Sequence, residues 1–411
     1  MLRPPNLCAI ADTPRIGPLS PAALKIGDIV LPNRVIFAPM SGITDAPFRR
    51  LVSRLGAGLV ISEMTASSAL VEGKREARLR AEGQGAGIHV VQLAGCEAKW
   101  MAEGARIAEA NGAAIIDINM GCPAKRVTTG YAGSALMRDL DHALALIEAT
   151  VAAVAVPVTL KMRLGWDAQA LNAPELARRA EAAGVKLVTV HGRTRCQFYD
   201  GRADWAAIRR IKQAVSIPVV ANGDITSIEE AAAAFAASGA DAIMVGRGAQ
   251  GRPWFPGELA RTLATGRREA TPSLARQHRL VADLYEEMLL HHGRAIGVRH
   301  ARKHLGWALD VAASCAGASA DMLRGVRARV LTADEPADVR QRLANAYDAF
   351  AALALVIPDA SRSEAIRDPS TPASEINRET GIPGSGLSRL AALGRDDSRK
   401  SAPMQSGRAA A

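Results

Sequence analysis

The strongest constraint on the fold is a regular alternation of short apolar runs with segments that have helical spacing. Most of the runs end in polar or glycine-containing residues, as buried parallel strands do before a loop. Gly112, Gly184 and Gly239 directly follow three of the helical segments, where a helix C-terminus favours glycine. The strand-like runs are 35–40, 59–64, 89–93, 114–120, 156–162, 187–191, 219–222 and 242–246, and the helical segments include 100–111, 140–154, 174–183, 205–215 and 228–238.

Eight βα units in succession over roughly 220 residues match a (β/α)8 TIM barrel in number and size. A doubly wound sheet is the alternative, but it seldom has this many units in strict succession. Its dinucleotide fingerprint GxGxxG is also missing from the first βα turn, residues 38–45. We therefore predict an α/β fold with a TIM-barrel domain over residues 24–264, which begins with a short hairpin at Leu24.

The remaining segments differ from the barrel in composition and periodicity. Residues 1–23 are Pro-rich without periodicity and predict a mobile segment, and 265–272 are polar and indicate a linker. Residues 272–356 have apolar side chains at helical spacing, which predicts a small all-helical domain. Residues 357–411 are rich in Ser, Arg, Pro, Gly and Ala, which predicts a disordered tail.

The composition indicates a cytoplasmic protein with a polyanionic partner. The net charge is +10 and the pI about 9.7, which favours nucleic acid, although a basic enzyme with a basic tail has the same composition. The five cysteines form no CxxC pair and no zinc spacing, so we expect a reducing compartment and no metal. No signal segment is apparent, and Glu148 and Pro157 interrupt the most apolar window, 143–160, so we expect no membrane span.

Polar residues stand at nearly every predicted strand end, where a barrel of this kind holds its ligand. The ends of the last two strands, Asn222-Gly-Asp224 and Gly246-Arg-Gly248, fit a phosphate site in which Arg247 adds a charged contact. The other ends carry Ser41, Glu63, Gln92, Asn119 with Cys122, Lys161 with Arg163, and His191 with Arg193.

A phosphate at those loops would place an extended ring over the barrel mouth. Gln92 and Lys161 would then face ring carbonyls and nitrogens, and a lysine there can stabilise a reduced flavin. The alternatives are an ion pair of Lys161 with Glu63 or Asp117, a core role for His191, and a small buried thiol for Cys122.

On these motifs the chain resembles the tRNA-dihydrouridine synthases, most closely the bacterial DusB type. The resemblance covers about Leu24 to about Leu355, and both termini lie outside it. Its motifs are Ala38-Pro-Met-Ser-Gly-Ile-Thr-Asp45, Ser62-Glu-Met64, Val91-Gln-Leu-Ala-Gly95, Asp117-Ile-Asn-Met-Gly-Cys-Pro-Ala-Lys125, Leu160-Lys-Met-Arg163, His191-Gly-Arg-Thr194, Asn222-Gly-Asp-Ile225, Gly246-Arg-Gly248 and Ala301-Arg-Lys-His-Leu-Gly-Trp307.

The resemblance implies an FMN enzyme that reduces the C5–C6 double bond of particular uridines in tRNA and is reloaded by NADPH or NADH. Hydride would pass from flavin N5 to C6, and Cys122 would donate the proton to C5, because a thiol is mostly protonated at neutral pH. Cys196 lies further along a loop and is the weaker candidate. The implied FMN contacts are Pro39, Met40, Ser41, Gln92, Asn119, Lys161, His191, Asn222, Gly223, Asp224, Gly246 and Arg247.

The target base must leave its stack, so the surface must supply compensating phosphate contacts. We expect a monomer whose helical domain binds tRNA, with Asn119 touching both flavin and uracil. The candidate tRNA contacts are Asn119, Lys125, Arg126, Arg163, Arg193, Arg299, Arg302 and Lys303, with Arg294 and His304 nearby. Two other functions stay open: a flavin barrel acting on a small molecule of the dihydroorotate or enoate type, and an RNA-binding scaffold without catalysis.

Overall fold

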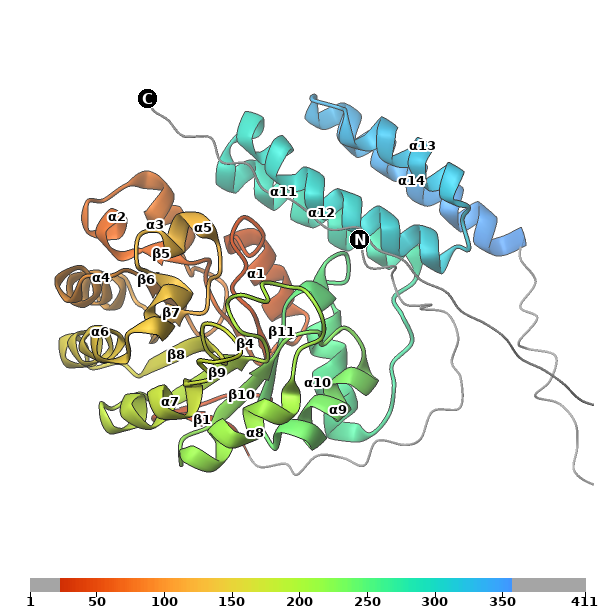
Figure 1. Cartoon of the computed structure of the whole chain (residues 1–411). Helices are drawn as coiled ribbons and strands as arrows, with labels where there is room; N and C mark the ends of the chain where they lie inside the picture. Colours follow the sequence, from red (N-terminus) through yellow and green to blue (C-terminus); the bar gives the residue numbers. More distant parts are fainter. Residues whose placement is uncertain (1–22, 357–411) are drawn as a thin grey trace, which may run out of the picture. The chain divides into compact units, whose positions relative to one another are not determined.

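A single parallel sheet forms the centre of the molecule in the computed structural model, which describes residues 23–356 (Figure 1). Its nine strand segments follow the order β4-β3-β11-β10-β9-β8-β7-β6-β5. They are β3 (Val35–Phe37), β4 (Leu59–Val60), β5 (Thr65–Ala66), β6 (Val90–Ala94), β7 (Ile115–Met120), β8 (Val158–Arg163), β9 (Leu187–His191), β10 (Val219–Asn222) and β11 (Ala242–Val245).

The two edge segments, β4 and β5, belong to one barrel strand. Between them the backbone N–H of Ile61 donates to Phe37 O at 3.3 Å, and that of Ser62 donates to Val90 O at 3.1 Å. Segment 59–66 therefore pairs with β3 through its first half and with β6 through its second half, which closes the sheet into a barrel. The predicted TIM barrel is confirmed. The predicted strand 59–64 forms a strand only at 59–60 and pairs again at 65–66, because the segment changes partner midway.

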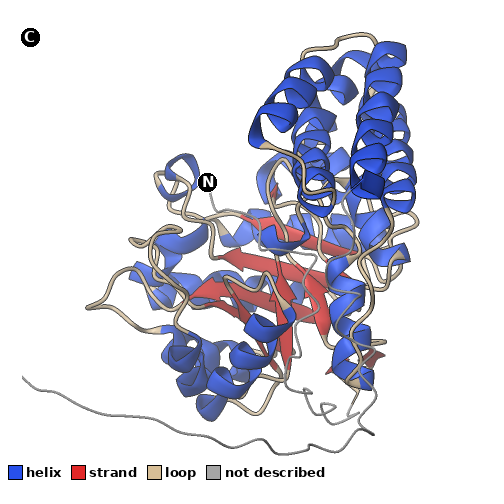
Figure 2. Cartoon of the chain, turned by 90° about the vertical axis from the view of Figure 1, so that its right-hand side faces the viewer, coloured by secondary structure: helices blue, strands red, loops and turns tan. Residues whose placement is uncertain are grey.

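Helices surround the strands on the outside (Figure 2). Gly112, Gly184 and Gly239 have φ values of +86°, +104° and +64°, the left-handed conformation predicted for them after their helices. The helices are α1 (Ala46–Arg54), α2 (Ser67–Val71), α3 (Arg75–Ala81), α4 (Ala98–Ala110), α5 (Lys125–Thr128), α6 (Leu140–Ala153), α7 (Ala173–Ala182), α8 (Trp205–Ala214), α9 (Ile228–Ser238) and α10 (Phe255–Thr265), with 3-10 turns η1 (Gly133–Arg138) and η2 (Arg247–Ala249).

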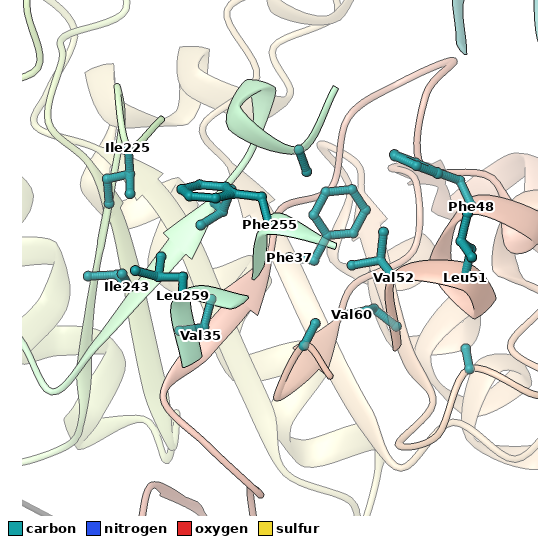
Figure 3. Packing of buried hydrophobic residues seen from close by; sticks show 14 of the residues in the cluster. Val35, Phe37, Phe48, Leu51, Val52, Val60, Ile225, Ile243, Phe255 and Leu259 are labelled. Carbon is teal, nitrogen blue, oxygen red and sulfur yellow. The ribbon is translucent and has the colours of Figure 1, made fainter. Parts of the chain in front are cut away.

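Successive strand residues point to opposite faces, which divides the buried side chains into two clusters. Val35 and Phe37 face outward and pack against residues such as Phe48, Leu51 and Phe255 (Figure 3). The residues between and after them, Ile36 and Ala38, belong to the cluster inside the barrel. The period of two seen in the sequence thus separates the barrel interior from the layer under the helices.

A hairpin closes the amino-terminal end of the barrel. It consists of β1 (Lys25–Ile26) and β2 (Ile29–Val30), as the sequence predicts. Leu24, Ile26 and Leu31 are buried against interior residues at the starts of the strands, among them Leu59, Val90, Ile115 and Ala242. Because this end is filled with apolar side chains, the carboxyl ends of the strands are left for polar groups.

Four helices follow the barrel and pack together, as the helical spacing predicts (Figures 1 and 2). Helix α11 also packs against α1 of the barrel, where Arg50 and Arg54 pair with Glu287 at 3.0 and 2.7 Å. The helices are α11 (Leu274–His292), α12 (Arg294–Cys315), α13 (Ala320–Leu331) and α14 (Pro336–Val356).

Among residues 23–356 no helix is long and apolar enough to cross a membrane. The apolar window 143–160 instead spans most of α6 and the first half of β8. The predicted mobile segment 1–23, apart from Ala23, and the predicted tail 357–411 lie outside the described residues.

His304 of α12 is buried where the helical domain meets the barrel. Its ring contacts Phe48 with centroids 4.6 Å apart and Trp307 with centroids 5.4 Å apart. Its Nε2 has no hydrogen-bond partner within the described part of the chain. Burial lowers the pKa of His304 to about 4, so the ring is neutral in the folded protein at neutral pH.

We therefore expect His304 to make the fold acid-sensitive. Above the unfolded-state pKa of about 6.5 the ring is neutral in both the folded and the unfolded state, so its titration takes nothing from the unfolding free energy. Between about 6.5 and 4 only the unfolded chain gains the proton, which costs about 3 kcal/mol of unfolding free energy. The unfolding free energy, measured by urea titration at several pH values in this range, is plotted against pH. Its slope in His304→Gln should be smaller than in wild type by the equivalent of about one bound proton. The control His142→Gln should keep the wild-type slope, and an unchanged slope in His304→Gln would contradict the assignment.

Candidate active site

A buried chain of side-chain hydrogen bonds crosses the middle of β6, β7 and β8 and reaches Asn119 near the carboxyl end of β7. Asp117 accepts from Thr159 Oγ1 and from Gln92 Nε2, both at 2.6 Å. The amide oxygen of Gln92 accepts from Asn119 Nδ2 at 2.8 Å. All four side chains are buried, so the direction of each bond is costly to reverse.

The Asp117 carboxylate fixes the orientation of both amides. Burial raises the pKa of Asp117, while the hydrogen bonds from Thr159 and Gln92 and the charge of Lys161 favour the carboxylate. In this arrangement the NH2 group of Gln92 faces Asp117 and donates to it. The Gln92 oxygen then faces the NH2 group of Asn119, which turns Asn119 Oδ1 toward the loop after β7. There it accepts from the backbone N–H of Gly121 at 3.2 Å and of Cys122 at 3.0 Å.

Further bonds hold the carbonyl groups of the Cys122 loop. Ser134 of η1 donates to Cys122 O through Oγ at 2.8 Å and through its backbone N–H at 3.1 Å. Arg163 Nε donates to Gly121 O at 2.9 Å. Cys122 is half-buried and close enough to Lys161 and Arg163 to influence both cations electrostatically. The thiol therefore has a fixed backbone beside two positive charges.

Arg163 joins the loops that follow β7 and β9. The residue is 1% exposed, and its Nη1 donates to the carbonyl oxygens of Thr194 and Phe198, both at 2.8 Å. Burial lowers its pKa to about 10, which leaves the guanidinium charged at neutral pH. Its contacts hold loops in place, and the ring of Tyr199 lies 5.5 Å from its guanidinium carbon.

Lys161 lies at the end of β8, opposite Asn119 in the sheet register. Its Nζ donates to Asn222 Oδ1 at 3.1 Å, and Asn222 Nδ2 donates to Met244 O at 2.9 Å. Neither alternative ion pair, with Glu63 or with Asp117, forms among the described residues. Burial lowers the pKa of Lys161 to about 8.

His191 at the end of β9 lies beneath the loop after β10. It is 7% exposed, and burial, reinforced by nearby cations beginning with Lys161, lowers its pKa well below 6.5. Gly223 has φ +116°, and a Cβ there would lie 2.6 Å from Cδ2 of the ring. Only glycine lets this backbone pass so close to the neutral imidazole.

Asp224 binds two arginines with different exposure. Arg193 is 1% exposed, donates to both carboxylate oxygens, and reaches the carbonyls of Asp200 at 3.0 Å and Gly201 at 2.6 Å. Arg247 Nη2 donates to Asp224 Oδ1 at 3.2 Å, while its side chain is 40% exposed. Arg193 is thus enclosed by protein oxygens, whereas Arg247 is oriented yet open to solvent.

Comparison with known proteins identifies the family. The family model "Dihydrouridine synthase (Dus)" matches residues 36–343. The chain belongs to the dihydrouridine synthase family.

Three relatives show how far this likeness extends. A probable tRNA-dihydrouridine synthase of Rhizobium leguminosarum bv. phaseoli is 55% identical over 78% of this chain and 96% of its own. A probable tRNA-dihydrouridine synthase of Rhodobacter capsulatus is 51% identical, over 79% of this chain and 98% of its own length. The tRNA-dihydrouridine synthase B of Xanthomonas campestris pv. campestris is 50% identical, over 69% of this chain and 86% of its own length. The resemblance found in the sequence motifs is confirmed.

The loops after the first and last strands of this dihydrouridine synthase also meet. The backbone N–H of Ala38 donates to Val245 O at 2.8 Å, and a Cβ on Gly246 would lie 3.5 Å from Met40 Sδ. The predicted contacts Pro39, Met40 and Ser41 therefore adjoin Gly246, and Ser41 is exposed. The predicted cofactor residues thus come together at one end of the barrel.

The predicted tRNA contacts separate into free and occupied cations. Lys125 and Arg126 on α5 and Arg299 on α12 are exposed and form no ion pair within residues 23–356. By contrast, Arg302 pairs with Asp334, Lys303 donates to Gly42 O, Arg294 pairs with Glu335, and Arg163, Arg193 and His304 are buried.

Sequence reasoning missed two features of the site. Tyr199 is 54% exposed, and its ring centroid lies 5.5 Å from the guanidinium carbon of Arg163 and 5.1 Å from that of Arg247. The adjacent pair Phe198-Tyr199 in a chain with 4% aromatic residues was the available signal. The positive-φ residues other than glycine in the described chain, Tyr131, Phe198 and Asp224, all lie in loops after β7, β9 and β10. Such strained backbone is typical of functional loops.

The hydrogen-bond chain predicts a difference between two substitutions of Asp117. Asp117→Ala leaves the NH2 group of buried Gln92 without its acceptor, so we expect a loss of about 1–3 kcal/mol in unfolding free energy. Asp117→Asn can still accept from Gln92 while donating to Thr159, so its loss should stay below about 1 kcal/mol. Urea unfolding of both variants measures this, and equal stability of Asp117→Ala and wild type would contradict the orienting role.

Proposed function

We propose that the protein is an FMN-dependent tRNA-dihydrouridine synthase, which reduces the C5–C6 double bond of specific uridines with NADPH or NADH as reductant. The observation that carries the proposal is the fixed loop of Cys122 beside Lys161, Asn222 and His191 at neighbouring strand ends. Membership of the dihydrouridine synthase family supports the reaction, and the names of the relatives support tRNA as substrate.

The donor set suits FMN. Gln92 and Asn119 each keep an amide N–H that the chain from Asp117 does not use, which suits ring carbonyls and nitrogens. Lys161 and the exposed, oriented guanidinium of Arg247 supply positive charge for the ring and the phosphate. Bound FMN would supply the hydride for uracil C6. The remaining proposed contacts are Pro39, Met40, Ser41, His191, Asn222, Gly223, Asp224 and Gly246.

Cys122 is the proposed proton donor to uracil C5. Hydride addition at C6 leaves negative charge on C5 and O4 of the base, and a thiol can neutralise it by protonating C5. Asn119 and Ser134 hold both the N–H and the C=O of Cys122, which supports a thiol held in one position. Asn119 is also the proposed contact to both the base and the ring.

The tRNA would approach over exposed cations next to the site. Lys125 and Arg126 are the first two residues of the short helix α5, which begins three residues after Cys122. Arg299 lies on α12 of the helical domain. Arg302 and Lys303 are further proposed phosphate contacts, which would exchange their present partners Asp334 and Gly42 O for phosphate oxygens. Arg163 and Arg193 would shape the loops around the base. The exposed ring of Tyr199 offers a stacking surface for a base outside its helix. The net charge of +10 agrees with this partner.

We place the enzyme in the cytoplasm, as a monomer, where its tRNA substrate is found. Cys96, Cys122, Cys196 and Cys315 are free thiols, which agrees with a reducing compartment.

The proton-donor role predicts a selective loss in Cys122→Ala. The variant should retain FMN but reduce unmodified tRNA about 10²–10⁴-fold more slowly, because only the general acid is removed. Cys196→Ala, an exposed thiol after β9, is the matched control and should keep wild-type turnover. Dihydrouridine formed per minute is measured by mass spectrometry of digested tRNA.

Full activity of Cys122→Ala would remove this residue from the mechanism. A flavin-containing wild-type protein that reduces dihydroorotate-type or enoate substrates but leaves tRNA unchanged would favour the small-molecule alternative. A protein that binds tRNA without taking up flavin would favour the scaffold.

The lowered pKa of Lys161 predicts a pH-dependent affinity for FMN. Below about pH 8 the flavin-free protein carries an ammonium there, and above it the neutral amine must take up a proton when the anionic cofactor binds. The dissociation constant of FMN should therefore rise by up to about tenfold per pH unit above 8. Lys161→Ala should bind FMN more weakly without this rise, as measured by flavin fluorescence. A tight, pH-independent Lys161→Ala variant would contradict the assignment.

A further inference from the structure

Three side chains with metal-binding atoms meet between the barrel and the helical domain. They are Asp45, the N-cap of α1, His292, the last residue of α11, and His300 in α12. One ligand atom from each lies within 4.8 Å of the other two. None of them belongs to the group of strand-end residues described above.

The first two side chains are held rigidly. Asp45 Oδ1 accepts the backbone N–H of Phe48 at 3.1 Å, and His292 Nε2 lies 2.8 Å from Asp45 Oδ2. Their side chains are 7% and 10% exposed. Capping of α1 fixes the carboxylate in the way that outer hydrogen bonds orient metal ligands.

His300 lies beside the Asp45–His292 hydrogen bond but takes no part in it. Its ring packs on that of His292 with centroids 4.5 Å apart and planes tilted by 45°. Within the described residues no hydrogen bond reaches its ring nitrogens, and the side chain is half-buried. An imidazole lone pair is thus free beside an anchored carboxylate and a second imidazole.

We propose that Asp45, His292 and His300 bind a divalent transition-metal ion of the zinc class, which ties α11 and α12 to the first βα unit of the barrel. Two imidazoles and one carboxylate are a common donor set for such ions, with a water in the fourth position. Ligands at about 2.1 Å from the metal in a tetrahedron lie about 3.4 Å apart. Metal binding would replace the proton shared by Asp45 and His292 and separate their ligand atoms from 2.8 Å by about 0.6 Å. Rotation of the half-buried His300 side chain would bring its ligand atom closer by at most about 1.4 Å from the present limit of 4.8 Å.

The neighbouring charges are compatible with a bound cation. Arg49 donates to the backbone oxygen of Thr44 at 2.6 Å and also to Glu82 O, and Lys303 donates to Gly42 O. Each cation is therefore held by oxygens of its own. The carboxylates of Glu63 and Glu82 act on Arg49, and Glu82 also acts on His291 beside His292. Arg299 adds one exposed positive charge near His300.

The test measures zinc in the full-length, flavin-containing protein. After removal of metal with a chelator, the protein is titrated with ZnCl2 against a chromophoric competitor, and zinc is counted by plasma mass spectrometry. Wild type should bind one zinc ion per chain, and His300→Ala should bind it at least about 100-fold more weakly, because one of three ligands is lost. His142→Ala, a histidine on α6 outside the cluster, should match wild type.

X-ray absorption at the zinc edge of the wild-type protein gives an answer that depends on no variant. Nitrogen and oxygen neighbours at about 2.0–2.1 Å are expected, whereas a sulfur shell near 2.3 Å would assign the zinc to a cysteine and overturn the proposal. Failure of wild type to bind zinc, or equal affinity in His300→Ala, would also overturn it. Zinc should raise the melting temperature of wild type and not of His300→Ala. These readouts do not involve tRNA reduction, so they stand or fall separately from the proposed function.

Discussion

The site depends on one buried carboxylate whose position is set by strand register. Asp117 lies opposite Gln92 on β6 and Thr159 on β8, so a parallel sheet of this register brings all three together. Asp117 accepts from Gln92, Gln92 accepts from Asn119, and Asn119 accepts from the backbone N–H of Cys122, so the carboxyl group orients this whole series. The backbone of the proposed catalytic Cys122 is thus held by side chains of the barrel strands, together with Ser134 of η1.

The two ends of the barrel have different roles: the amino-terminal end is packed with apolar side chains, and the carboxyl-terminal end carries the polar groups of the site. The hairpin and the apolar starts of the strands fill one end, which leaves the other free for buried polar groups. Those groups are expensive to bury, and the protein satisfies them with one another and with backbone carbonyls. Arg163 and Arg193 illustrate this, since their guanidinium groups hold loops together while Arg247, on the same carboxylate as Arg193, remains exposed.

The sequence predicted the barrel because apolar runs and C-terminal glycines are local signals. It could not predict that segment 59–66 changes partner, since that depends on barrel closure. Arg163 and Arg193 at strand ends were predicted to contact tRNA, yet both are buried, because burial depends on neighbours far along the chain. The meeting of Asp45, His292 and His300 has no spacing signal either, as about 250 residues separate the first two. Strand-end positions were predictable, whereas hydrogen-bond direction required the structure.

The central claim is that this arrangement of residues serves the reduction of uridines in tRNA. The most direct measurement is a map of dihydrouridine in tRNA from cells that lack the gene, compared with cells that carry it. The account predicts that dihydrouridine disappears at one or more defined tRNA positions and returns when the wild-type gene is restored. An unchanged dihydrouridine pattern in cells in which this is the sole enzyme of its family would contradict it.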